Sequence, residues 1–143
     1  MIRIINIVIG NTDLTHMYRD TGSILYTLAK DYDWDSTFLY LSKNKEYFSY
    51  PNFEEYVNLL CIGDDPEDYE KRKEAIRQFI KDHISEYDVV YFMGYGSTLY
   101  KMARLCKKVD PNIKVYVKMD LNINGFHHFY ENSLGRKIKN YLE

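Results

Sequence analysis

The stretch Ile2-Arg3-Ile4-Ile5-Asn6-Ile7-Val8-Ile9 decides the fold. It is rich in β-branched residues and almost continuously apolar, which is typical of a strand covered on both faces of a parallel sheet. We therefore predict a central strand at residues 2–9. Gly10-Asn11-Thr12-Asp13 follows, and apolar residues at helical spacing resume only at Ile24. Connections in α/β units usually span about two to six residues, so this longer connection is a candidate functional loop.

Four further apolar segments alternate with helical patterns along the rest of the chain. We predict strands at residues 37–41, 57–62, 88–93 and 113–119, and helices around 24–29, from 64 to about 85, around 99–106, and from about 131 to 141. Strands that alternate with helices imply right-handed crossovers. The fold class predicted is α/β: a Rossmann-like three-layer α/β/α domain with a mostly parallel sheet of about five strands. A chain of 143 residues has the size of one such domain, residues 1–143.

Composition narrows the function classes. There are 19 basic and 21 acidic residues, and the resulting net charge of -2 gives no general attraction to nucleic acid, so we predict no nucleic-acid partner. No apolar run reaches the roughly 18 residues of a membrane span, and the N-terminus lacks a cleavage signal. Cys61 and Cys106 lie in apolar patterns without paired ligand spacing. We predict buried, reduced thiols and a cytoplasmic protein.

Residues 100–118 carry a local excess of positive charge. The basic residues there are Lys101, Arg104, Lys107, Lys108, Lys114 and Lys118, against the single acidic Asp110. Segregated charge of this kind is more often a solvated helix face than a binding patch. Contact with an anionic partner is the alternative.

Candidate binding residues follow from the rule that ligands of open parallel sheets bind outside the carboxyl ends of the strands. The residues selected are Gly10, Asn11, Thr21, Gly22, Gly94, Tyr95, Gly96, Ser97, Lys118, Asp120 and Asn122. Glycines let backbone N–H groups approach a ligand, and the helices that follow offer N-termini suited to phosphate. The other interpretation is that glycines only make tight turns. The two weigh about equally for Gly22 and Gly96, whereas a plain turn is favoured for Gly63.

Motifs of several common enzyme classes are missing. Residues 94–99 have Leu99 where a dinucleotide fingerprint needs its third glycine, and no Gly-Lys-Ser/Thr of a P-loop occurs. The adjacent His127 and His128 would diverge on a strand or a helix, which makes joint metal binding improbable. Ser97 lacks the His and acid of a hydrolase triad. We predict no metal site and no resident cofactor, and the catalytic residues remain unknown.

The order of features over residues 88–122 resembles a known family. It runs Asp-Val-Val-Tyr-Phe-Met, a small-residue turn, a Leu-Ala/Cys-rich helix, then Pro-Asn-Ile-Lys-Val-Tyr-Val-Lys-Met-Asp. This looks like the N-terminal domain of GT-B fold glycosyltransferases, especially the retaining glycosyltransferase family 4. Residues 2–30 are similar to the opening of the same family. The resemblance implies the acceptor-binding half of a two-domain enzyme, which transfers a sugar from a nucleotide-sugar donor to a glycan or lipid-linked acceptor.

The resemblance also implies partners and roles. A second Rossmann-like domain, in cis or in trans, would hold most of the donor, so the isolated chain is expected to be inactive. We expect the last predicted helix to end close to Glu143, where relatives run on into another strand. The loop at residues 10–22 would face the donor diphosphate, and Tyr95, Ser97, Asp120 and Asn122 would orient acceptor hydroxyls. The basic helix could contact a lipid-linked acceptor, at the inner face of a membrane.

Two departures from the family pattern are visible in the sequence. Many relatives have a His just after the strand equivalent to 113–119, where this chain has Lys118, Asp120 and Asn122. Glu46 and Glu54 have the spacing of the family's Glu-x7-Glu motif, but they flank an aromatic loop in the wrong domain, and we interpret them as coincidence.

Two alternative functions stay open. A stand-alone flavodoxin-like or receiver-like signalling module would also have five parallel strands, and it can carry a lysine after the last strand, as Lys118 does. A receiver needs an acidic pair after its first strand, where this chain has Gly10-Asn11. A purely structural interaction domain is the third hypothesis, motivated by the 15 tyrosines.

Overall fold

A computed structural model describes residues 1–8, 20–42, 51–64, 68–94 and 97–119 of the chain. Its strands are β1 (Arg3–Val8), β2 (Asp35–Ser42), β3 (Val57–Asp64), β4 (Val89–Gly94) and β5 (Lys114–Met119). Its helices are α1 (Asp20–Tyr32), α2 (Pro51–Glu54), α3 (Tyr69–His83), the 3-10 helix η2 (Ile84–Glu86) and α4 (Ser97–Val109).

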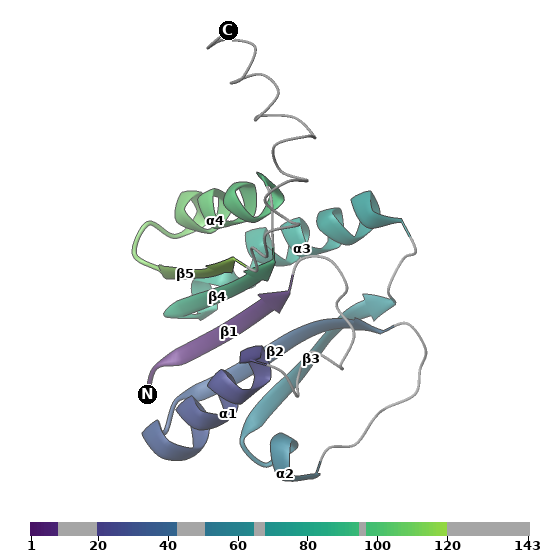
Figure 1. The fold of residues 1–143 in the computed structure, drawn as a ribbon. Coiled ribbons are helices and arrows are strands. Elements are labelled where there is room, and N and C mark those ends of the chain that lie inside the picture. The colour runs from purple at the N-terminus through teal and green to yellow at the C-terminus, as the bar shows by residue number, and fades with distance from the viewer. Residues whose placement is uncertain (9–19, 43–50, 65–67, 95–96, 120–143) are drawn as a thin grey trace, which may run out of the picture.

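The strands form one five-stranded sheet in the order β3-β2-β1-β4-β5. Each neighbouring pair is parallel, and β1 is central (Figure 1). Every residue of β1 after Arg3 is buried, as its continuous apolar pattern predicts. The predicted Rossmann-like α/β fold with a parallel sheet of about five strands is therefore confirmed.

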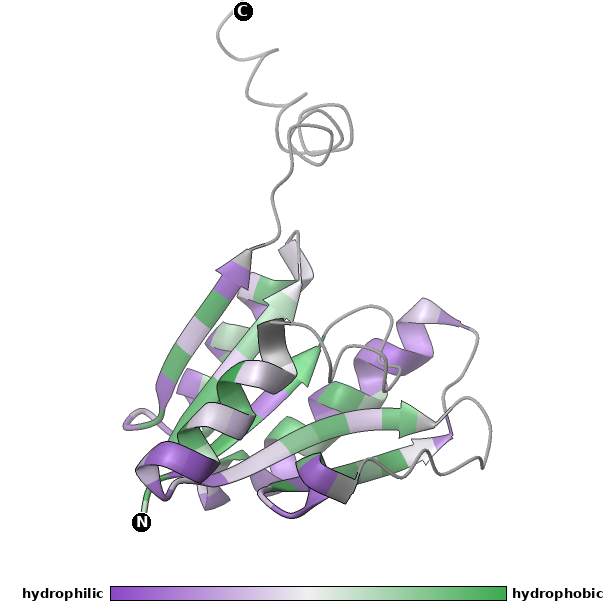
Figure 2. Ribbon diagram, turned by 60° about the horizontal axis from the view of Figure 1, so that its bottom comes forward, coloured by the Kyte–Doolittle hydropathy of each residue, from purple (hydrophilic) through white to green (hydrophobic). Residues whose placement is uncertain are grey.

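Helices cover both faces of the sheet (Figures 1 and 2). α3 and α4 pack over one face, where the buried side chains are Ile5, Ile7, Leu39, Ile76, Phe79, Ile80, Ile84, Val90, Phe92, Leu99, Met102, Cys106 and Ile113. α1 and the short α2 lie over the other face, where the buried set is Ile4, Val8, Leu25, Phe38, Tyr40, Phe53, Val57, Val89 and Tyr91. Alternate residues of β1 thus enter opposite core clusters, as the period of two along a strand requires.

The helix predicted from residue 64 begins later, at Tyr69. Asp68 is its N-cap, because the side chain of Asp68 accepts a hydrogen bond of 2.8 Å from the backbone N–H of Glu70. Residues 63–64 instead extend β3 beyond its predicted end at residue 62. The apolar stripe of α3 contains Ile76, Phe79 and Ile80 at helical spacing, and these three side chains are buried against the sheet.

Other predictions need correction. Gly63 lies inside β3 with a φ of 132°, a backbone conformation that favours glycine, and the β2–β3 register shifts beside it. Thr21 and Gly22 belong to α1, not to the loop before it. Cys61 is exposed because β3 is an edge strand, whereas Cys106 is buried as predicted. The helix predicted at residues 131–141 lies outside the described residues.

Candidate functional site

The sheet has a topological switch point between β1 and β4. β1 leads to α1 on one face, and β4 leads to α4 on the opposite face, so the two connections leave these neighbouring strands in opposite directions. Val8 pairs with Met93, so the carboxyl ends of both strands lie side by side. In open α/β sheets this is the position at which ligands bind.

Gly94 shapes the β4 side of this edge. It is the last residue of β4, is buried, and has a φ of 153°, which side-chain-bearing residues rarely adopt. α4 then begins at Ser97. The backbone conformation at Gly94 therefore helps to turn the chain from the sheet into the helix, and this glycine has a conformational role besides any contact with a ligand.

Five of the eleven predicted binding residues fall in the described part of the chain, namely Thr21, Gly22, Gly94, Ser97 and Lys118. Gly94 and Lys118 are brought close together, because Lys118 pairs with Met93 in the β4–β5 ladder and Gly94 pairs with Met119. Ser97 opens α4 and is exposed. Thr21 and Gly22 lie in the first turn of α1, which runs back along β1 (Figure 1). Predicted residues outside the described ranges are Gly10, Asn11, Tyr95, Gly96, Asp120 and Asn122.

The electrostatics of this edge favour a polar or anionic ligand. The first turn of α4 has no acidic residue, so the helix itself places no carboxylate at the positive end of its dipole. The hydroxyl of Ser97 is a donor and an acceptor, and the ammonium group of Lys118 is a donor. Together these groups suit phosphate or sugar hydroxyls.

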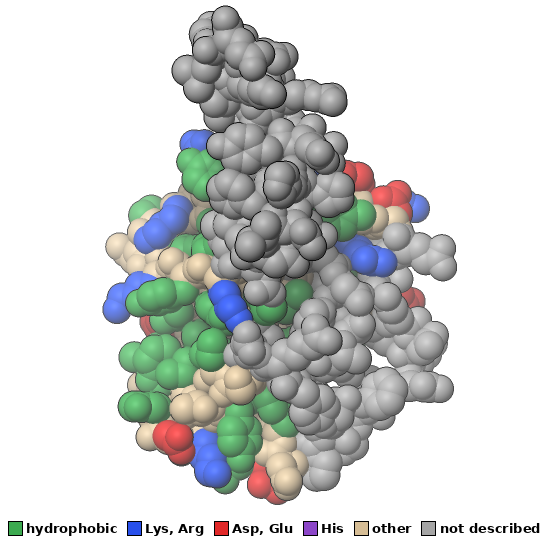
Figure 3. Space-filling view, in the orientation of Figure 1, with side chains coloured by type: hydrophobic (Ala, Val, Ile, Leu, Met, Phe, Trp, Pro, Cys, Tyr) green, Lys and Arg blue, Asp and Glu red, His purple; other side chains and the backbone are tan. Residues whose placement is uncertain are grey.

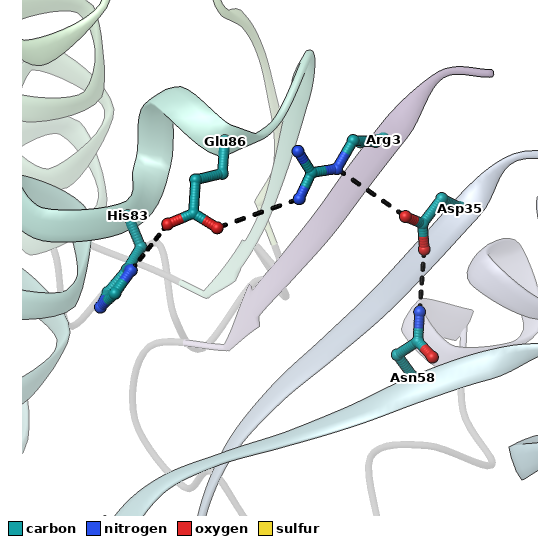
Figure 4. Close-up of polar contacts among 5 residues, drawn as sticks. All are labelled: Arg3, Asp35, Asn58, His83 and Glu86. Carbon is teal, nitrogen blue, oxygen red and sulfur yellow. Dashed lines mark hydrogen bonds and ion pairs between the residues drawn. The ribbon is translucent and has the colours of Figure 1, made fainter.

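The sequence did not predict a polar chain that lies at the amino ends of the strands (Figure 4). Arg3 lies 3.7 Å from Asp35 and 3.9 Å from Glu86, and Glu86 is 2.8 Å from the Nδ1 of His83. Asn58 donates a hydrogen bond of 2.8 Å to Asp35. The interruption of an apolar strand by Arg3 was the only local signal, because its partners come from distant segments.

A second omission lies inside the sheet. Asn6 is fully buried in the central strand and donates a hydrogen bond of 3.0 Å to the carbonyl oxygen of Tyr91. Within the described part of the chain, Asn6 Oδ1 and Ser36 Oγ are buried without a hydrogen-bond partner. Buried polar atoms are nearly always paired, so both positions are exceptions to the rule.

Three titratable groups in the described part of the chain have a raised pKa. Burial raises the pKa of the Cys106 thiol to about 12. Burial also raises the pKa of Tyr87, while the hydrogen bond with Thr37 opposes that shift. The hydrogen bond with Tyr26 raises the pKa of Lys30. None of these groups belongs to the predicted set of binding residues.

Two further searches cover the described residues only. They contain no group of three or more His, Cys, Asp or Glu side chains arranged to hold a metal ion. Among the helices that can be described, none has the length and apolar character needed to cross a bilayer.

Comparison with known proteins finds no matching family model, no similar curated protein and no similar solved structure. The resemblance to a glycosyltransferase domain thus stays a prediction from the sequence.

Proposed function

We propose that this chain is the acceptor-binding N-terminal domain of a two-domain glycosyltransferase. The whole enzyme would transfer a sugar from a nucleotide-sugar donor to a glycan or lipid-linked acceptor. The observation that supports this proposal is the switch point between β1 and β4, where the strand ends, the turn at Gly94 and the start of α4 meet at one edge. A second domain, in cis or in trans, supplies most of the donor site.

The residues at this edge have the chemistry that an acceptor site needs. Retaining transfer depends on stabilising the leaving diphosphate and on holding the acceptor hydroxyl in place. Ser97 and Lys118 orient acceptor hydroxyls in this proposal, and the first turn of α1 at Thr21 and Gly22 faces the donor phosphates. Because half of the cleft belongs to the other domain, binding to this chain alone is weak.

The basic face of α4 is the proposed contact with a lipid-linked acceptor at the inner face of a membrane. Lys101, Arg104, Lys107 and Lys108 are exposed along it, and blue side chains stand out on the α4 and β5 side of the molecule in Figure 3. Each basic residue near an anionic surface contributes about 1 kcal/mol. Sedimentation with liposomes should show a preference for anionic over zwitterionic lipid, and equal partition into both would remove this part of the proposal.

The flavodoxin-like or receiver-like alternative has less support from topology. Those folds have the strand order 2-1-3-4-5, in which the third strand lies inside the sheet. In this chain β3 is at the edge and the order is β3-β2-β1-β4-β5, the order of the first five strands of the Rossmann fold.

Amide NMR titration of the labelled chain tests the proposed function. The ligands are UDP-glucose, UDP-N-acetylglucosamine, GDP-mannose and a panel of mono- and disaccharide acceptors. We expect millimolar binding that shifts the amide peaks of Gly94, Ser97 and Lys118, because these residues lie at the switch-point edge. Peaks of the polar chain around Arg3 at the other edge should stay in place.

The matched variants are Ser97→Ala and Ser85→Ala. Both serines are exposed. Ser97 begins α4, whereas Ser85 lies in η2, near the amino ends of the strands. Ser97→Ala should weaken acceptor binding several-fold, whereas Ser85→Ala should leave it unchanged. Absence of shifts with every sugar and nucleotide sugar would contradict the proposal and favour a structural interaction domain.

A further inference from the structure

A cavity of about 580 Å³ lies between the edge strand β3 and helix α3, outside the candidate site at the switch point. Its lining is Leu60, Cys61, Ile62, Ala75, Gln78, Phe79, Asp82, His83, Glu86 and Tyr87. None of the residues predicted to bind an acceptor lines it. Its volume is within the range of small-molecule sites, roughly 300–1,000 Å³.

The packing of the helices explains why the cavity forms here. α3 contacts α4, and α4 contacts β4 and β5, so this helix pair lies toward the β5 side of the sheet. Among the described elements, β3 at the opposite edge is covered less completely by these helices, and Leu60 and Ile62 are only partly buried against the core. Phe79 forms an aromatic wall on the α3 side, with its ring centroid 5.2 Å from that of His83. The walls are therefore largely apolar.

The rim of the cavity is acidic. Asp82 accepts hydrogen bonds of 3.0 and 2.8 Å from Gln78 Nε2, and within the described part of the chain it has no cationic partner. Glu86, in contrast, is already held by His83 and Arg3 (Figure 4). A neutral amide cannot compensate the charge of Asp82, so this carboxylate is the group that a cationic ligand would meet.

We propose that this cavity binds a small amphipathic cation, namely an ammonium group attached to an aromatic or apolar body. The body packs against Leu60, Ile62 and Phe79, and the ammonium group pairs with Asp82. The aromatic ring of Phe79, which lines the cavity, adds attraction for a cation. Charge complementarity selects this occupant, because an anionic ligand would meet the carboxylate of Asp82.

Three probes that share a phenyl body separate charge from apolar contact: phenethylamine, 2-phenylethanol and 3-phenylpropionate. In amide NMR titrations we expect phenethylamine to bind with a millimolar Kd and to shift the peaks of Leu60, Ala75 and Asp82. The neutral and anionic probes should bind at least about 5-fold more weakly, since they lack the favourable charge interaction.

Two variants and a control locate the interaction. Asp82→Asn keeps the shape of the side chain and should weaken phenethylamine binding about 5-fold. Glu74→Gln on the same helix should change nothing, because Glu74 pairs with Arg77 and does not line the cavity. Ala75→Phe should fill the cavity and abolish binding. If that variant unfolds, Asp82→Asn still decides the result.

Several outcomes would overturn the proposal. Equal affinity for phenethylamine and 2-phenylethanol would show that the cavity binds the phenyl body and does not distinguish a cationic from a neutral ligand. Binding that is unchanged in Asp82→Asn would remove the carboxylate from the site, and no shift with phenethylamine would remove the site itself. If the chain self-associates in sedimentation experiments and Ala75→Phe weakens that association, the cavity would instead bind a second copy of the chain. Each of these results leaves the acceptor titrations at Gly94 and Ser97 unaffected.

Discussion

The two faces of the sheet are covered in different ways. On one face, α3 and α4 contact each other and bury an apolar cluster that includes Phe92. On the other, α1 is the only described helix longer than one turn, and its cluster surrounds Phe38. Asn6 Oδ1 and Ser36 Oγ, the two buried oxygens that have no partner among the described residues, belong to strand positions that face α1. We infer that the α3–α4 face contributes more to stability.

Truncation of one aromatic side chain on each face tests this comparison with the largest expected effect. Phe92 and Phe38 are both fully buried. Phe92→Ala should lower the free energy of unfolding by about 3–5 kcal/mol, and Phe38→Ala should cost less because a single helix can relax into the space. Urea denaturation of both variants measures the difference. A larger loss for Phe38→Ala would reverse the ranking of the faces.

The two cysteine thiols are expected to differ strongly in their rate of alkylation. Cys106 is buried in the α3–α4 core, and Cys61 is exposed on β3. At pH 8 we expect iodoacetamide to modify Cys61 at least about 100-fold faster than Cys106, since only the thiolate reacts and burial disfavours it. Mass spectrometry after timed quenching gives both rates. Comparable rates would mean that the α3–α4 core opens readily.

The same thiol predicts a pH dependence of stability. The pKa of Cys106 is about 12 in the folded chain against an ordinary value of 9.0. Between these values the unfolded chain loses the proton and the folded chain keeps it, so this contribution to stability is lost as pH rises from about 9 to about 12. Denaturation of Cys106→Ala across this interval should show a weaker decline than the unmodified chain.

Ser36 and Thr37 are adjacent in β2 and allow a matched comparison, with a smaller expected change in the free energy of unfolding. The hydroxyl of Ser36 has no partner among the described residues, while that of Thr37 bonds to Tyr87. Ser36→Ala should raise the free energy of unfolding by about 1 kcal/mol because it removes an unpaired buried hydroxyl, and Thr37→Val should lower it by about 1 kcal/mol. A loss of stability in Ser36→Ala would indicate that the hydroxyl has a partner in solution.

The smallest effect is expected at the polar chain around Arg3, which lies at the amino ends of the strands on the α3–α4 face of the sheet. Arg3 is 44% exposed, and its ion pairs of 3.7 and 3.9 Å are long. Arg3→Met should therefore cost less than about 1 kcal/mol, and the cost should shrink further in 1 M salt. A cost above 2 kcal/mol that salt does not reduce would show that packing against Tyr87 dominates.

Much of the candidate site at the carboxyl ends of the strands could be predicted from the sequence, whereas the polar chain at their amino ends could not. Gly94 ends an apolar strand and Ser97 begins the next helix, so their place at a strand end is a local feature. Arg3 and Glu86 meet only because β1 and β4 are neighbours in the sheet. The cavity beside β3 was missed for the same reason, since its two walls come from separate segments.

The sequence by itself determined the α/β class, the five strands and the apolar stripe of α3, because periodicity and β-branching act over a few neighbouring residues. Only the tertiary structure decided the strand order, which places β3 at an edge, exposes Cys61 and leaves the groove against α3. Strand order depends on the direction of each crossover and on contacts between distant segments. Local patterns in the chain carry too little information to fix either.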